Sequence, residues 1–303
     1  MSNRIVLIKL WVVSLLWGCN YVASAYMLRE FSPIYLSFAR LVVMSLFLII
    51  SALILKAWKR PTATEWKLLI FAGISGTLFN QLFYFTGLQH STAGNAALIV
   101  ALSPIATLLL SRLFLKEKIT GTKLTGAFIA LIGVVCIVLY GGKSFGISKG
   151  DIYLLLAMFG LSVSLLFIRK LTTTMTSFQV TVYSTVIGTM MMIPAAGYEE
   201  ISGHLHGSHQ VWTWVLLIAV AVIGQGMAGF WWNQGIAEAG VSISAMFMNI
   251  PPFVAIIISY FLLGDPIHAA QLIGGALILA GVLVTNLNLR LPMHPKVKVN
   301  SKM

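Results

Sequence analysis

Charged side chains are scarce in this sequence. Only 9% of its 303 residues are Asp, Glu, Lys or Arg, whereas soluble domains carry roughly 25%. Acidic residues are the scarcest of these, with eight in all, while hydrophobic residues make up 58% of the chain. This composition excludes an ordinary soluble globular protein and indicates an integral membrane protein.

Cysteines and enzyme motifs are also few or missing. The two cysteines, Cys19 and Cys136, both lie in apolar runs, so neither a disulfide framework nor a zinc site is predicted. The sequence contains no HExxH, GxSxG, P-loop or CxxC pattern, and no Asp or Glu lies well inside an apolar run. We therefore expect no metal, no cofactor and no catalytic residues, and a membrane-embedded enzyme is the remotest alternative.

Apolar runs dominate what is present. A helix needs about 20 mostly apolar residues to span a bilayer, and ten runs of this kind are separated by short loops. They cover residues 5–26, 33–55, 66–88, 94–115, 122–140, 151–170, 177–196, 212–235, 242–263 and 269–289. The sequence therefore predicts an all-α integral membrane protein with ten transmembrane helices and no soluble domain.

Basic residues indicate how these helices are oriented. The net charge of +12 would suggest a nucleic-acid partner in a soluble protein. If the amino terminus is cytoplasmic, sixteen of the twenty Lys and Arg lie inside, three (Arg29, Lys143 and Lys149) lie outside, and Arg40 lies within the second run. This asymmetry predicts a multi-pass plasma-membrane protein with both termini in the cytoplasm, in contact with lipid and not with nucleic acid.

Two distant parts of the chain repeat one pattern. With an offset of 148 residues, 87–135 matches 235–283 at eleven positions, among which Pro104 corresponds to Pro252 and Gly126 to Gly274. Upstream the best offset is nearer 144. We therefore expect two five-helix repeats, 1–146 and 147–303, the second ending in a short basic cytoplasmic tail. Because five is odd, the second repeat enters the membrane from the opposite side, an arrangement typical of transporters.

Several motifs of the chain resemble the EamA-like, ten-helix members of the drug/metabolite transporter superfamily. These are LWGCNYVA at 16–23, Arg40, and the long segment 82–120 with its counterpart 232–268. The resemblance implies a transporter of small metabolites, with amino-acid export common in the family. The second half departs from the family pattern at Leu161 and Ser162, where a Trp-Ala pair commonly mirrors Trp17-Gly18.

Polar and aromatic residues inside the runs are the candidate substrate contacts. Amides in hydrocarbon are costly unless they face protein or water, so they indicate either a wet cavity or hydrogen bonds between helices. The candidates are Asn80, Gln81, Tyr84, Gln225 and Trp232, with Trp17, Asn20 and Tyr21 of the first run as weaker ones. Arg40 either attracts an anionic group of the substrate or ties helices together through carbonyl groups.

The repeated prolines, and the acids that follow them in the chain, suggest further roles. Pro104 and Pro252 should each kink a helix, either as a pivot beside a central cavity or as a static bend. Asp265, which precedes Pro266, and Glu117 are expected to start the following helices and to set the loops before them, with proton coupling as the alternative. Small residues in the fifth and tenth runs allow close helix packing, within a monomer or between the subunits of a homodimer.

These observations favour export of small polar or amphipathic organic metabolites, such as amino acids, by alternating access. The alternatives are a flippase for lipids or lipid precursors and a passive channel.

Overall fold

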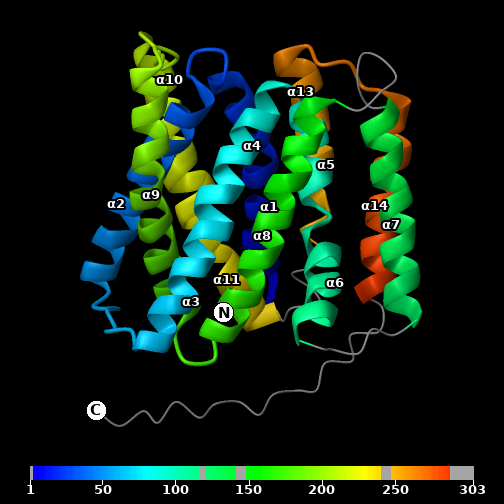
Figure 1. Cartoon of the computed structure of the whole chain (residues 1–303). Helices are drawn as coiled ribbons and strands as arrows, with labels where there is room; N and C mark the ends of the chain where they lie inside the picture. The colour runs from blue at the N-terminus through cyan, green and yellow to red at the C-terminus, as the bar shows by residue number, and fades with distance from the viewer. Residues whose placement is uncertain (1–2, 116–120, 141–147, 240–246, 287–303) are drawn as a thin grey trace.

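The computed structural model describes residues 3–115, 121–140, 148–239 and 247–286. Within these ranges every regular element is a helix, and Figure 1 shows them side by side in one bundle. In chain order they are α1 (Asn3–Met27), α2 (Pro33–Ile54), α3 (Ala63–Gly73), η1 (Ile74–Phe79), α4 (Asn80–Gln89), α5 (Ala93–Val100), α6 (Ser103–Leu115), α7 (Gly121–Tyr140), α8 (Lys149–Leu171), α9 (Ser177–Ile201), α10 (Val211–Ala219), η2 (Val220–Met227), α11 (Ala228–Ala239), α13 (Ile250–Leu263) and α14 (Ala269–Asn286).

The helices are long and apolar enough for a membrane. Seven continuous helical segments meet the length and hydropathy of a span, and three shorter apolar helices lie at 124–137, 250–263 and 269–284. These segments fall in the ten predicted apolar runs. The all-α membrane fold is therefore confirmed, while the two repeats and their boundary at residue 146 stay predictions.

The two ends of the bundle differ in charge. At the upper end in Figure 1, loops meet through Ser32 and Glu199, through Ser91 and Asp151, and through Arg29 and the carbonyl of Leu263. Five of the eight acids lie at this end: Glu30, Asp151, Glu199, Glu200 and Asp265. The lower end carries basic residues from two loops and the helix ends beside them: Lys56, Lys59, Arg60, Lys67, Arg169 and Lys170. This is the asymmetry from which the sequence predicts a cytoplasmic lower end.

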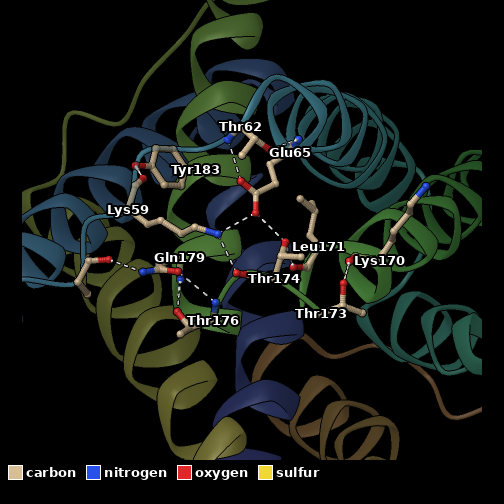
Figure 2. A network of polar contacts seen from close by, with 11 residues as sticks. Lys59, Thr62, Glu65, Lys170, Leu171, Thr173, Thr174, Thr176, Gln179 and Tyr183 are labelled. Carbon is tan, nitrogen blue, oxygen red and sulfur yellow. Dashed lines mark hydrogen bonds and ion pairs between the residues drawn. The ribbon is translucent and has the colours of Figure 1, made fainter. Parts of the chain in front are cut away.

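At the lower end, a polar network joins the α2–α3 loop to the α8–α9 loop (Figure 2). Glu65 forms a capping box with Thr62 at the start of α3, pairs with Lys59 at 2.8 Å, and accepts a 2.6 Å hydrogen bond from Thr174. Gln179 of α9 donates to the carbonyl of Ala57. The start of α3 and the start of α9 are thereby held together.

Two of the membrane-spanning segments change from α to π geometry midway. The third consists of α3, η1 and α4, and the eighth consists of α10, η2 and α11. The range of η1 maps onto 218–223 at the offset of 144 and onto 222–227 at the offset of 148, and both ranges overlap η2. π segments occur often at functional sites because they interrupt the regular ladder of backbone hydrogen bonds.

Proline acts differently from the predicted kink. The fourth segment is divided by a turn at Ala101–Leu102, and Pro104 lies in the first turn of the new helix α6. Pro252 likewise lies in the first turn of α13. The expectation of a kink inside a continuous helix is therefore wrong, because a proline in a first turn removes an N–H group that has no helical acceptor anyway. A hinge role for either break stays a prediction.

Of the two roles predicted for Asp265, the helix start is wrong, whereas its contacts fit the setting of the loop. Helix α14 begins four residues later, at Ala269, where Gln271 accepts a hydrogen bond from the His268 backbone. The carboxylate of Asp265 accepts a hydrogen bond from Ser259 instead, so it closes the end of α13. Glu117, its counterpart in the sequence, lies outside the described residues.

Helices α7 and α14 form a pair at one edge of the bundle, as Figure 1 shows. A Cβ atom on Gly133 would lie 2.5 Å from the carbonyl oxygen of Gly274, so only glycine permits this approach. Gly281 meets Gly126 and Ala130 in the same way. These small residues therefore serve packing within the subunit.

Candidate functional site

Arg40 is the buried cation of the bundle interior. It lies seven residues after Pro33, about 10 Å into α2 at 1.5 Å per residue, and only 3% of its surface is exposed. One terminal nitrogen donates to Ser24 Oγ at 2.6 Å and the other to Asn20 Oδ1 at 2.9 Å. Its guanidinium carbon lies 5.1 Å from the centroid of the Phe85 ring. Three segments, α1, α2 and α4, thus meet at this side chain.

The partners of Arg40 are neutral. Asn20 and Ser24 lie one turn apart on α1, and Ser24 also donates to Asn20 at 3.2 Å. The Nε atom of Arg40 is buried without a hydrogen-bond partner. In the part of the chain that the structure describes, no carboxylate pairs with Arg40. Arg40 therefore ties α2 to α1, as one of the two predicted alternatives has it, but through side-chain oxygens and not through backbone carbonyl groups.

Aromatic side chains surround the same face of α1. The rings of Tyr21 and Tyr84 are 6.2 Å apart, and those of Trp17 and Trp232 are 5.1 Å apart. Trp17 and Tyr21 lie one turn apart on α1, so α4 and α11 approach it at successive levels. All four side chains are partly exposed. The structure thus brings these four predicted site residues together with Asn20 and Arg40.

The remaining predicted amides have different surroundings. Asn80 is buried and donates to the carbonyl of Ala157 at 2.8 Å. This is a hydrogen bond between helices, the predicted alternative to a wet cavity. Gln81 donates to Asn80 at 3.4 Å. Gln225 lies half-buried in η2. Asn80 therefore serves the packing of α4 on α8 in this conformation.

Sequence reasoning missed two features of the interior. The first is that Ser24 and Phe85 complete the surroundings of Arg40. The spacing of four residues between Asn20 and Ser24 could have indicated that Ser24 shares a helix face with Asn20. The second feature is a buried polar network around Asp151, which is 1% exposed. Ser91 donates to Asp151 at 2.5 Å, Asn95 at 3.4 Å, and Gln271 donates to Asn95 at 2.7 Å. This network joins the starts of α5, α8 and α14.

A cavity of about 620 Å³ lies elsewhere, between α6, α7 and α8. Its lining is apolar except for Thr125 and comprises Leu102, Ile105, Ala106, Leu109, Leu124, Thr125, Ala127, Phe128, Leu131, Val134, Leu155 and Met158. Leu109, Leu124 and Phe128 are exposed, so the cavity opens to the outside of the bundle. It does not include any of the predicted site residues.

Comparison with protein families decides the identity of the bundle. A model of the EamA-like transporter family matches residues 4–139 and, separately, residues 148–287. The chain belongs to the EamA-like transporter family. As a member of that family it is a multi-pass membrane transporter, and transport implies a small-molecule substrate.

Relatives of this EamA-like transporter carry transporter names. The uncharacterized transporter YyaM of Bacillus subtilis is 31% identical over 302 residues, which cover 97% of each chain. A probable terminal-alkyne amino-acid exporter of Streptantibioticus cattleyicolor is 26% identical, with 89% of each chain covered. A solved crystal structure shares the fold, with a TM-score of 0.61 at 18% identity and coverage of 93% of this chain and 96% of its own.

Proposed function

We propose that this EamA-like transporter exports small polar or amphipathic organic metabolites, with amino acids and related compounds as the first class. The observation that carries the proposal is the gathering of hydrogen-bonding and aromatic side chains around α1, next to the π segment η2. Aromatic rings can cover an apolar side chain, while an amide and a guanidinium fix polar groups. A named amino-acid exporter among the relatives supports the substrate class.

The proposed site consists of the predicted residues on four segments of the bundle. They are Trp17, Asn20, Tyr21, Arg40, Asn80, Gln81, Tyr84, Gln225 and Trp232. In this conformation Asn80 is engaged with α8, so it becomes available to substrate only if α4 and α8 move apart. The break before Pro104, which separates α5 from α6, provides a candidate pivot for such a movement, and Pro252 in the first turn of α13 is the second candidate.

Transport should be measured in proteoliposomes that contain the purified protein. Labelled amino acids should equilibrate across the bilayer and exchange with unlabelled substrate, against empty liposomes as control. We expect Tyr84→Ala and Trp232→Ala each to lower the rate about tenfold, because each change removes transition-state contacts worth on the order of 1.4 kcal/mol. Wild-type rates in both variants, at equal protein content, would remove these rings from the site.

Energy coupling is part of the same proposal. In the described residues the acids lie at helix ends or in loops, which favours facilitated movement down the gradient of a metabolite that the cell makes. Exchange should therefore persist without a pH difference or a membrane potential. Strict dependence on an imposed proton gradient, abolished by Glu117→Gln, would overturn this part and assign the coupling to Glu117.

The apolar cavity between α6, α7 and α8 favours one second candidate, a lipid flippase. A flippase needs a polar path for the headgroup as well as room for the acyl chains, and the cavity lining supplies only Thr125 as a polar side chain. Fluorescent phospholipids in the same proteoliposomes test this alternative. Protein-dependent movement of the lipid, without movement of amino acids, would favour the flippase.

The orientation in the membrane is proposed from the charge asymmetry of the two ends. Single cysteines at His209 and Arg60, both exposed, should be introduced in a background without Cys19 and Cys136. With cytoplasmic termini, an impermeant thiol reagent applied to intact cells labels position 209 and not position 60. The reverse result would invert the assignment.

A further inference from the structure

The environment of Arg40 contains polar groups but no negative charge. Its partners are a hydroxyl oxygen, an amide oxygen and the face of an aromatic ring. A guanidinium this deeply buried is unfavourable unless an anion or water accompanies it. Because the described residues supply no anion at this place, we infer that the transported molecule supplies one, as a carboxylate bound to Arg40. This inference rests on the proposed function and narrows its substrate class.

One edge of the guanidinium retains an unpartnered donor, the buried Nε, to which that carboxylate would bind. Nε has no hydrogen-bond partner, while the two terminal nitrogens are held by Ser24 and Asn20 on one side of α1. A carboxylate has two oxygens in a plane and matches two neighbouring N–H groups of arginine. One oxygen would bind Nε, and the other would share or replace the bond to Asn20. Ser24 can hold the guanidinium in place throughout.

The Asn20 side chain faces Gly224 of η2, and a Cβ atom placed on that glycine would lie 3.5 Å from Asn20 Nδ2, an ordinary contact. At Gly224, η2 therefore presents only backbone to Asn20. The rings of Tyr21 and Tyr84, 6.2 Å apart, are close enough to cover an apolar side chain of the bound molecule.

The distribution of acids determines which substrates are disfavoured. In the described part of the chain, acids lie at helix ends or in loops: Glu30, Glu65, Asp151, Glu199, Glu200, Glu238 and Asp265. A positively charged substrate therefore finds no ion partner beside α1 and is repelled by Arg40. Monocarboxylates and zwitterions are accepted, whereas organic cations and amines without a carboxylate are rejected.

Three compounds that share one benzyl side chain differ in which charged groups they carry, so they test the carboxylate and the ammonium group separately. Phenylalanine carries a carboxylate and an ammonium group, phenylpyruvate carries only the carboxylate, and phenylalaninol carries only the ammonium group. In proteoliposomes with the full-length protein, we expect phenylalanine and phenylpyruvate to exchange at least tenfold faster than phenylalaninol. In detergent, phenylpyruvate should raise the thermal unfolding temperature and phenylalaninol should leave it unchanged.

Variants of Arg40 test the residue itself. Arg40→Gln keeps hydrogen-bond donors and loses the charge, so the rate of carboxylate exchange should fall at least tenfold. Arg40→Lys keeps the charge without the planar fork, so its rate should lie between those of the wild type and Arg40→Gln. Arg29→Gln, a change at an exposed arginine that contacts the Leu263 carbonyl, is the matched control and should exchange at the wild-type rate.

The outcomes distinguish this inference from the proposed function. If the wild-type protein exchanges none of the three compounds, the proposed substrate class is overturned, and the inference with it. If it exchanges phenylalaninol as fast as phenylalanine, or if Arg40→Gln keeps the wild-type preference for carboxylates, the inference is overturned and the proposed function stands. If Arg40→Gln does not fold, the wild-type exchange rates and the shift in unfolding temperature still decide.

Discussion

Asn20 of α1 and Ser164 of α8 lie 144 residues apart, the offset of the upstream repeat, and each faces a glycine of a π segment. The two contacts differ in tightness. A Cβ on Gly76 of η1 would lie 2.2 Å from Ser164 Oγ and 2.5 Å from its Cβ, whereas one on Gly224 of η2 would lie 3.5 Å from Asn20 Nδ2. Both contacts join one predicted half to the other; the contact of α8 with η1 is closed, and that of α1 with η2 is looser.

The chemistry of the two contacts differs as well. Asn20 accepts a hydrogen bond from the charged Arg40, while Ser164 donates to the carbonyl of Ala72 at 3.3 Å. The residue 144 positions after Arg40 is Ser184, which donates to its own helix at Val180. At these positions the first predicted half therefore carries a buried cation, and the second carries hydroxyl groups.

The largest difference should come from adding one methyl group to each glycine. Gly76→Ala forces Ser164 and its backbone away and should cost about 1–3 kcal/mol, the usual range for overpacking. Gly224→Ala meets no close atom and should leave the free energy of unfolding nearly unchanged. Unfolding in mixed micelles with increasing SDS measures both. Adding Ser164→Gly to Gly76→Ala should restore part of the loss; equal losses in both alanine variants would refute the difference in tightness.

A smaller difference is expected between the hydroxyl groups on α1 and α8. Ser24→Ala removes an acceptor from a buried guanidinium and should destabilise the protein by about 1–3 kcal/mol, as for other buried groups left without a partner. Ser164→Ala removes a neutral hydrogen bond between helices, and such bonds in membranes average about 0.6 kcal/mol. The same unfolding measurement compares them. A larger loss for Ser164→Ala would show that the charge of Arg40 adds nothing to the first contact.

The smallest effect is predicted at the position that corresponds to Arg40. Ser184 Oγ bonds only to carbonyls of its own helix, so Ser184→Ala should change the free energy of unfolding by less than about 0.5 kcal/mol. Amino-acid exchange in proteoliposomes should stay at the wild-type rate. A marked fall in exchange would indicate that the second half also contributes to recognition at this level.

The sequence was sufficient for features that depend on composition and helical spacing. Apolar runs located the helices, and the polar and aromatic residues inside these runs supplied the site candidates, among them Trp17, Asn20 and Tyr21 of α1. The partners of individual polar groups could not be obtained in this way, because they depend on helices distant in the chain. Asn80 donates to the carbonyl of Ala157 on α8, a residue 77 positions away. The break before Pro104 was missed because proline is compatible both with a kink inside a helix and with the first turn of a new one.

The edge pair α7–α14 has a consequence for the surroundings of the protein. Its close approach through Gly133 and Gly274 joins the two helices to each other, while the 620 Å³ cavity separates part of α7 from α6 and α8. A space with this apolar lining stays free of water. Because it opens to the outside of the bundle, we expect acyl chains of the bilayer to enter it. Acyl-chain length and fluidity should then affect the energetics of this region, as a side-chain substitution would.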